Sequence, residues 1–133
     1  MSKPVEKTIL IDDSDIDLFI QRRFLEVYEF SSQLVLYKSA NEALNDLKLN
    51  GKPAPDVIFL DLNMPEVDGF TFLSKFNELP EPVKTKTKIV VLTSSNSAQD
   101  RERALLHKNV IQFITKPLKQ SDIEELRDLV LGK

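Results

Sequence analysis

Several residue types are rare or missing in this chain of 133 residues. It has no cysteine, one histidine and three glycines. Without cysteine there is no disulfide, thiolate zinc site or thiol nucleophile, and one histidine cannot build a multi-histidine metal site. The glycines Gly51, Gly69 and Gly132 lie far apart, which excludes a glycine-rich phosphate loop or dinucleotide fingerprint. Any metal is therefore expected to be a hard cation held by oxygen ligands.

Long apolar runs and an excess of positive charge are also lacking. The longest apolar runs are far shorter than the ~20 residues that a membrane-spanning helix needs. No apolar signal core follows the amino terminus. The formal net charge of −3 disfavours a nucleic-acid partner. We therefore expect a cytoplasmic protein that binds neither membrane nor nucleic acid.

Short apolar runs alternate along the chain with longer amphipathic stretches. Five runs rich in isoleucine, valine and leucine have the length of strands: Thr8–Ile11, Leu34–Tyr37, Val57–Leu60, Ile89–Leu92 and Val110–Ile114. Several are apolar throughout, as expected for a parallel sheet covered on both faces. The amphipathic stretches between them predict helices, so the order is (βα)5.

Apolar residues recur at helical spacing in residues 16–27, 40–47, 72–76 and 123–130. A further helix over about 98–108 has little apolar surface at its start, so we expect it to be the least stable. Helix starts are predicted where a serine precedes an acid by three residues, at Ser14, Ser39, Ser97 and Ser121. A helix stop is predicted at Gly51, a solvated loop over Asn77–Lys88, and a plain turn at Asp68–Gly69.

Polar side chains follow four of the five predicted strands. Asp12 and Asp13 end the first strand, Asp61 the third, residues 93–95 the fourth, and Lys116 follows the fifth. In open α/β sheets, ligands bind at the carboxyl ends of strands where the strand order reverses. The second strand ends without an acid, so we expect it to lie away from the reversal between the first and third strands. This suits the order 2-1-3-4-5. We therefore predict a doubly wound, flavodoxin-like fold in one domain, 1–133, with residues 1–6 as an amino-terminal tail.

These strand ends bring together groups with a specific chemistry. Three carboxylates repel each other unless a cation lies between them, and Mg²⁺ (or Mn²⁺) is the natural choice. A lysine and a hydroxyl facing the same point can bind phosphoryl oxygens, and Asp61 can act as the nucleophile that accepts the phosphoryl group. A plainer interpretation is that Asp12 and Asp13 only favour a helix dipole, with Thr93 and its neighbours a solvated helix start.

Four segments together carry a family resemblance: Ile9–Ser14, Phe59–Phe70, Val90–Ser94 and Phe113–Pro117. In this order and at these strand ends, they resemble the signature motifs of receiver domains of two-component response regulators. The resemblance covers about residues 7–131. It implies the receiver fold, Mg²⁺ as cofactor, and phosphoryl transfer from a histidine kinase or phosphotransfer protein.

The resemblance also implies a role for each matching residue. Asp61 resembles the phosphoacceptor and a metal ligand, Asp13 a direct ligand, and Asp12 a ligand acting partly through water. The backbone carbonyl of Asn63 would complete the protein ligands. Asn63 and Ser95 match the positions that flank the path of attacking water and tune dephosphorylation.

On the phosphoryl side, Thr93 and Lys116 resemble the hydroxyl and the lysine that bind the phosphoryl oxygens. The bond from Lys116 to Pro117 is expected to be cis, and Phe113 is expected to rotate inward when Thr93 moves. Asn109 stands where a glycine is usual, and we expect it to accept a left-handed conformation.

The predicted function is therefore a phosphoacceptor switch. Phosphorylation would reshape the face made by the helix near 98–108, the fifth strand and the last helix. With 133 residues there is no room for an output domain, so output would be a protein contact or onward phosphotransfer. We do not expect a separate-substrate enzyme.

Three other possibilities stay open. The chain could be a phosphate-independent docking module, or a receiver cut from a longer regulator. An aspartyl-phosphate phosphatase would want a second acid where Asn63 stands.

Overall fold

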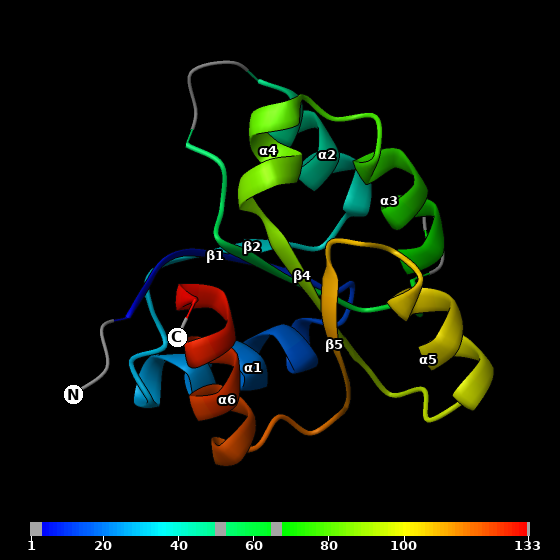
Figure 1. Ribbon diagram of the computed structural model, residues 1–133. Helices are drawn as coiled ribbons and strands as arrows, with labels where there is room; N and C mark the ends of the chain where they lie inside the picture. Colours follow the sequence, from blue (N-terminus) through cyan, green and yellow to red (C-terminus); the bar gives the residue numbers. More distant parts are fainter. Residues whose placement is uncertain (1–3, 50–52, 65–67, 133) are drawn as a thin grey trace.

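A central parallel sheet lies between two layers of helices (Figure 1). The computed structural model describes residues 4–49, 53–64 and 68–132. Its elements in chain order are β1 (Val5–Ile11), α1 (Asp15–Val27), β2 (Ser31–Tyr37), α2 (Ala40–Lys48), β3 (Val57–Leu60), α3 (Gly69–Phe76), α4 (Glu81–Lys86), β4 (Lys88–Thr93), α5 (Ala98–Leu105), β5 (Val110–Thr115) and α6 (Gln120–Leu131). β1 begins two residues inside the segment 1–6 that was expected to be a tail.

The strand order is β2-β1-β3-β4-β5, and every neighbouring pair is parallel. This confirms the predicted fold class. The four residues of β3 are all buried, as expected for a strand covered on both faces. Ile11 pairs with both Tyr37 and Leu60, so β1 and β3 end at the same level.

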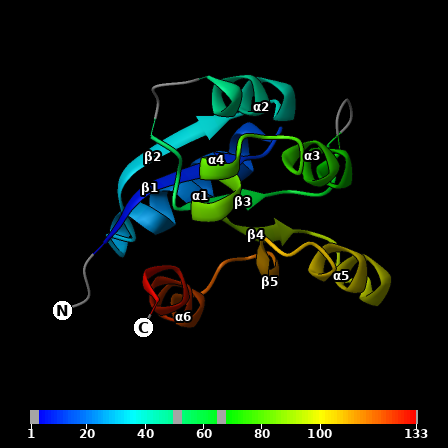
Figure 2. The same cartoon turned by 45° about the horizontal axis from the view of Figure 1, so that its top comes forward.

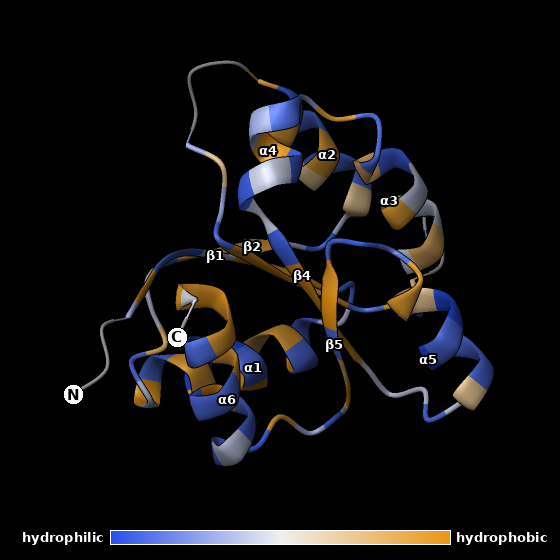
Figure 3. Ribbon diagram, in the orientation of Figure 1, coloured by the Kyte–Doolittle hydropathy of each residue, from blue (hydrophilic) through white to orange (hydrophobic). Residues whose placement is uncertain are grey.

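The helices cover the two faces unequally (Figure 2). α1 and α6 pack on one face through Leu18, Leu25, Ile123 and Leu126. α2 and α3 cover the other face, together with smaller contributions from α4 and α5. The hydropathy colouring in Figure 3 shows largely apolar strands in the centre and a mixture of polar and apolar residues along the helices. No helix of the described residues has the length and hydrophobicity to cross a membrane.

Three of the four predicted helix caps are confirmed. The hydroxyls of Ser14, Ser39 and Ser97 accept the backbone N–H groups of the residues three positions later, at 3.2, 3.3 and 3.2 Å. The prediction for Ser121 is wrong, because it lies inside α6. There the Lys119 N–H donates to the Asp122 carboxylate at 2.9 Å, so the cap falls two residues earlier. Gly51 lies outside the described residues.

The segment Asn77–Lys88 is not only a loop, because it contains the six-residue helix α4. Pro82 stands in its first turn, where a missing N–H costs no intrahelical bond. Glu81 at the start and Lys86 at the end complement the helix dipole. A helix this short buries only Val83, so no apolar period in the sequence reveals it.

Asn109 fixes the end of α4 rather than adopting a left-handed backbone. Glu29 is the one described non-glycine residue with positive φ, at 51°, so the expectation for Asn109 is wrong. The buried Asn109 amide donates to the carbonyls of Lys84 and Thr87, at 2.7 and 2.8 Å.

Asp68 and Gly69 form a helix start rather than a plain turn. Asp68 caps α3 by accepting the Thr71 N–H at 2.8 Å. A Cβ on Gly69 would lie 2.6 Å from Leu62 Cα and 2.8 Å from the Asp61 carbonyl oxygen. The glycine therefore lets α3 pack directly against the backbone that carries Asp61.

α5 is the least anchored of the longer helices, as its composition predicted. Ala104 is its one buried residue. It ends at Leu105, so His107 lies beyond the helix and is half-buried. Arg103 also stacks over the ring of Phe70, 3.9 Å from its centre, which ties α5 to α3.

Candidate functional site

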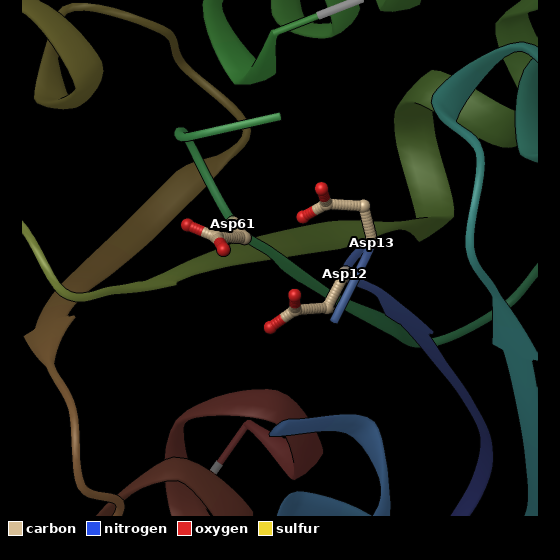
Figure 4. A group of neighbouring side chains, drawn as sticks. All are labelled: Asp12, Asp13 and Asp61. Atoms are coloured by element: carbon tan, nitrogen blue, oxygen red, sulfur yellow. The ribbon is translucent and has the colours of Figure 1, made fainter. Parts of the chain in front are cut away.

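Three carboxylates converge at the carboxyl ends of β1 and β3. Because Ile11 pairs with Leu60, Asp12 and Asp61 follow side by side. One carboxylate oxygen from each of Asp12, Asp13 and Asp61 lies within 4.8 Å of the others (Figure 4). Asp12 and Asp61 are 1% and 6% exposed, whereas Asp13 faces solvent. The sequence therefore identified the members of this cluster correctly.

The two buried carboxylates accept hydrogen bonds from nearby backbone N–H groups, and Asp12 also accepts one from the side-chain amide of Gln21. Asp12 accepts the Ser14 N–H at 3.0 Å and the Gln21 amide at 3.4 Å, and Asp61 accepts the Asn63 N–H at 3.1 Å. Burial raises the pKa of Asp12 above its usual range, although its hydrogen bond from Lys116 opposes this effect. Asp13 accepts no hydrogen bond within the described part of the chain, which leaves its oxygens available to a cation.

Lys116 reaches the same point from the loop after β5. Its Nζ lies 2.8 Å from Asp12, 2.8 Å from Asp17 and 3.4 Å from Asp61. Burial alone would lower the pKa of Lys116, but the bonds to Asp12 and Asp17 and the charge of Asp61 raise it above its ordinary value. The ammonium is therefore held in its charged form. The predicted cis bond to Pro117 is confirmed.

Asp17 is the member of this site that sequence reasoning missed. It lies in the first turn of α1, where an acid is expected for the helix dipole alone. Its carboxylate instead crosses to Lys116, 99 residues further along the chain. The available signal was the position of Asp17 three residues after the Ser14 cap, in the first helical turn that follows Asp12 and Asp13.

Thr93 is fully buried at the end of β4. Its hydroxyl accepts the side-chain amide of Asn63 and the Ser95 N–H, both at 3.3 Å. The Ser95 hydroxyl donates to Asp100 at 2.7 Å and accepts the Ser97 N–H at 3.2 Å. Ser95 thus organises the start of α5, while Asn63 is the residue that spans the gap between Asp61 and Thr93.

Phe113 lies inward in this structure. It is 8% exposed and packs in the core on the side of α3 and α5. Val91 pairs with Phe113, and Thr93 pairs with Thr115. Phe113 therefore lies on the same face of the sheet as Thr93, two residues closer to the amino end of the strand.

The donor set suits a hard cation. Three carboxylates within 4.8 Å of each other place strong negative charge at one point. All candidate ligands are oxygen atoms, which Mg²⁺ and Mn²⁺ prefer. The residues present therefore fit such an ion.

Comparison with known proteins identifies relatives that match most of this chain. The family model of the response regulator receiver domain matches residues 8–128. A protein-glutamate methylesterase/protein-glutamine glutaminase from Shewanella sp. is 32% identical over 131 residues, which are 96% of this chain and 35% of that protein. The methanogenesis regulatory protein FilR2 of Methanothrix harundinacea is 30% identical, over 93% of this chain and 83% of that protein. This chain thus spans only about a third of the methylesterase, and 7% of a matching hybrid signal transduction histidine kinase of Dictyostelium discoideum.

Solved structures of receiver proteins have the same fold as this chain. A two-component response regulator from Cytophaga hutchinsonii superposes with a TM-score of 0.88 at 28% identity, covering 98% of this chain and all of that one. A receiver protein from Dyadobacter fermentans gives 0.85 at 31% identity, with 95% and 98% covered. The receiver domain of a Pseudomonas aeruginosa sensor histidine kinase, solved with magnesium coordinated in its active-site cleft, gives 0.78 at 18% identity, with 97% and 99% covered. At that identity the likeness concerns the fold.

Proposed function

Because this chain belongs to the response regulator receiver domain family, we propose that it is a phosphoacceptor of two-component signalling in which Asp61 takes the phosphoryl group. The observation that carries the proposal is the convergence of Asp12, Asp13 and Asp61 with Lys116 at one edge of the sheet. A docking module that did not use phosphate would have no need of this arrangement, in which the buried carboxylates of Asp12 and Asp61 meet a half-buried lysine.

Asp12, Asp13, Asp61 and the carbonyl of Asn63 would hold Mg²⁺, or Mn²⁺. When bound, the cation neutralises the carboxylates and the charge of the transferring group. A receiver domain of the same fold from Pseudomonas aeruginosa was solved with magnesium in its active-site cleft.

In the transfer itself, an oxygen of Asp61 attacks phosphorus of a phosphohistidine on the donor protein. The P–O bond to Asp61 forms as the P–N bond breaks, and the departing imidazole takes a proton from solvent. Lys116 and Thr93 would bind the phosphoryl oxygens, since both lie at the same edge of the sheet as Asp61.

The donor would be a histidine kinase or a phosphotransfer protein. Ile16, Phe19 and Ile20 are exposed apolar residues on α1, which begins beside the acidic site. They offer an apolar surface from which a donor protein can reach Asp61.

Output would use the face of α5, β5 and α6. α5 buries only Ala104, so a shift of Thr93 can move it at low energetic cost. Phosphorylation would shift the population toward a form that some molecules already adopt.

The test is incubation with acetyl phosphate and Mg²⁺ followed by intact mass spectrometry. We expect one phosphoryl group on the parent and none on Asp61→Asn. Asp15→Asn, which removes an exposed acid from the first turn of α1, should keep the adduct. A parent that takes no phosphoryl group with either Mg²⁺ or Mn²⁺ would contradict the proposal and favour a phosphate-independent docking role.

A further inference from the structure

Lys116 is shared unequally among three carboxylates. Its ammonium lies 2.8 Å from Asp12 and Asp17 but 3.4 Å from Asp61. We propose that Asp17 is a positioning residue, which draws Lys116 toward α1 and away from Asp61 and so slows phosphoryl uptake. This inference rests on the proposed phosphoacceptor function.

The start of α1 places Asp17 for this contact. Ser14 caps the helix, and its hydroxyl accepts the Asp17 N–H at 3.2 Å. With its backbone fixed in this way, Asp17 can direct its carboxylate across to the loop after β5. The contact joins α1 to the segment that carries Lys116.

Asp17 is also the partner that Lys116 can release most easily. The side chain of Asp12 is 2% exposed, so losing Lys116 would leave a buried carboxylate without its cation. The side chain of Asp17 is 40% exposed, and water can replace the lysine there.

The consequence for phosphoryl transfer follows from the number of donors. A lysine ammonium has three N–H groups, and three carboxylates already surround this one. Because the contact to Asp61 is the longest of the three, Lys116 must move to donate closely to a phosphoryl oxygen there, and this movement weakens one of the two 2.8 Å contacts. Breaking the contact between Lys116 and Asp17 therefore adds to the barrier to phosphoryl uptake. A lysine that already pointed at the phosphoryl position would not need this rearrangement.

Asp15 provides a matched control. It lies in the same first turn of α1 and carries the same charge. Its side chain is 77% exposed and pairs with Lys38 at 3.0 Å, not with Lys116. Replacing Asp15 therefore removes a nearby negative charge without releasing the lysine.

The experiment measures the initial rate of phosphoryl uptake from acetyl phosphate at fixed Mg²⁺. We expect Asp17→Asn to be roughly three- to fivefold faster than the parent, from the typical strength of a partly exposed ion pair. Asp17→Ala should be at least as fast, while Asp15→Asn should stay within about twofold of the parent, since salt screens an exposed charge. Asp17→Glu, which keeps the carboxylate, should restore the parent rate.

Two results would overturn the inference. One is an Asp17→Asn rate equal to or below that of the parent, with Asp17→Ala agreeing. The other is an equal acceleration in Asp15→Asn, which would show that reduced repulsion of the anionic donor is sufficient. In both cases the proposed function stands, because the parent still takes the phosphoryl group. A parent that takes none overturns both proposals.

Discussion

Among single residues, Asn63 has the most informative set of contacts. Its N–H donates to Asp61, and its side-chain amide donates to Thr93 at 3.3 Å and to Ser94 at 3.4 Å. The side chain therefore bridges the loops after β3 and β4 beside the proposed phosphoacceptor. From this position it would restrict the approach of water to a phosphoryl group on Asp61.

We predict that Asn63→Ala increases the rate constant of dephosphorylation at least about threefold, because water could then approach the phosphoryl group more freely. The measurement is the decay of the mass adduct after the donor is removed, with the unfolding free energy of each variant as a check. Asn77→Ala, at an exposed asparagine after α3, is the matched control. Equal decay rates for Asn63→Ala and the parent would show that Asn63 does not restrict the approach of water.

Ser95, the other residue proposed to tune dephosphorylation, is a less clean probe. Its hydroxyl bonds to Asp100 and Ser97 at the start of α5. Substitution would therefore also lower the stability of that helix.

Among the elements, α4 depends on contacts that are distant in sequence. We predict that Asn109→Gly lowers the free energy of unfolding by about 1–3 kcal/mol, because the carbonyls of Lys84 and Thr87 lose their buried donor. Urea unfolding measures this, and Asn96→Gly, in an exposed loop, controls for the flexibility that glycine adds. Equal losses in the two variants would show that the Asn109 amide contributes nothing to stability.

The elements also differ in how far the sequence predicts them. The apolar runs of β3 and β4 are unambiguous, and the observed strands match within one residue at each end. α4 has six residues and α6 begins at a lysine cap, so neither boundary follows from a periodic pattern. Short helices are costly to nucleate and depend on tertiary contacts, which local sequence does not contain.

At the scale of the whole molecule, the acidic cluster should couple metal binding to stability. We predict that Mg²⁺ raises the midpoint of thermal unfolding, because an ion bound only by the folded state stabilises it by mass action. At one hundred times the dissociation constant the gain is about 2.7 kcal/mol. Chelation with EDTA should reverse it.

Two variants make this prediction specific. Asp13→Asn should lose most of the shift, because Asp13 is one of the three clustered acids. Without added metal it should be at least as stable as the parent, since removing one carboxylate relieves repulsion. Asp15→Asn should keep the full shift. An unchanged midpoint of the parent at saturating Mg²⁺ would contradict a metal site here.

The apolar runs and the residues that follow them predicted the parallel sheet and the edge at which Asp12, Asp13, Asp61 and Lys116 gather. This was possible because parallel strands end together, and residue type and strand position are both visible in the sequence. Which of these side chains contact one another became clear from the folded structure. It showed Lys116 nearer to Asp17 than to Asp61, and Asn109 bonded to the end of α4. Such contacts depend on shifts of about one ångström in how helices pack, and hydrogen-bond strength changes steeply over that distance.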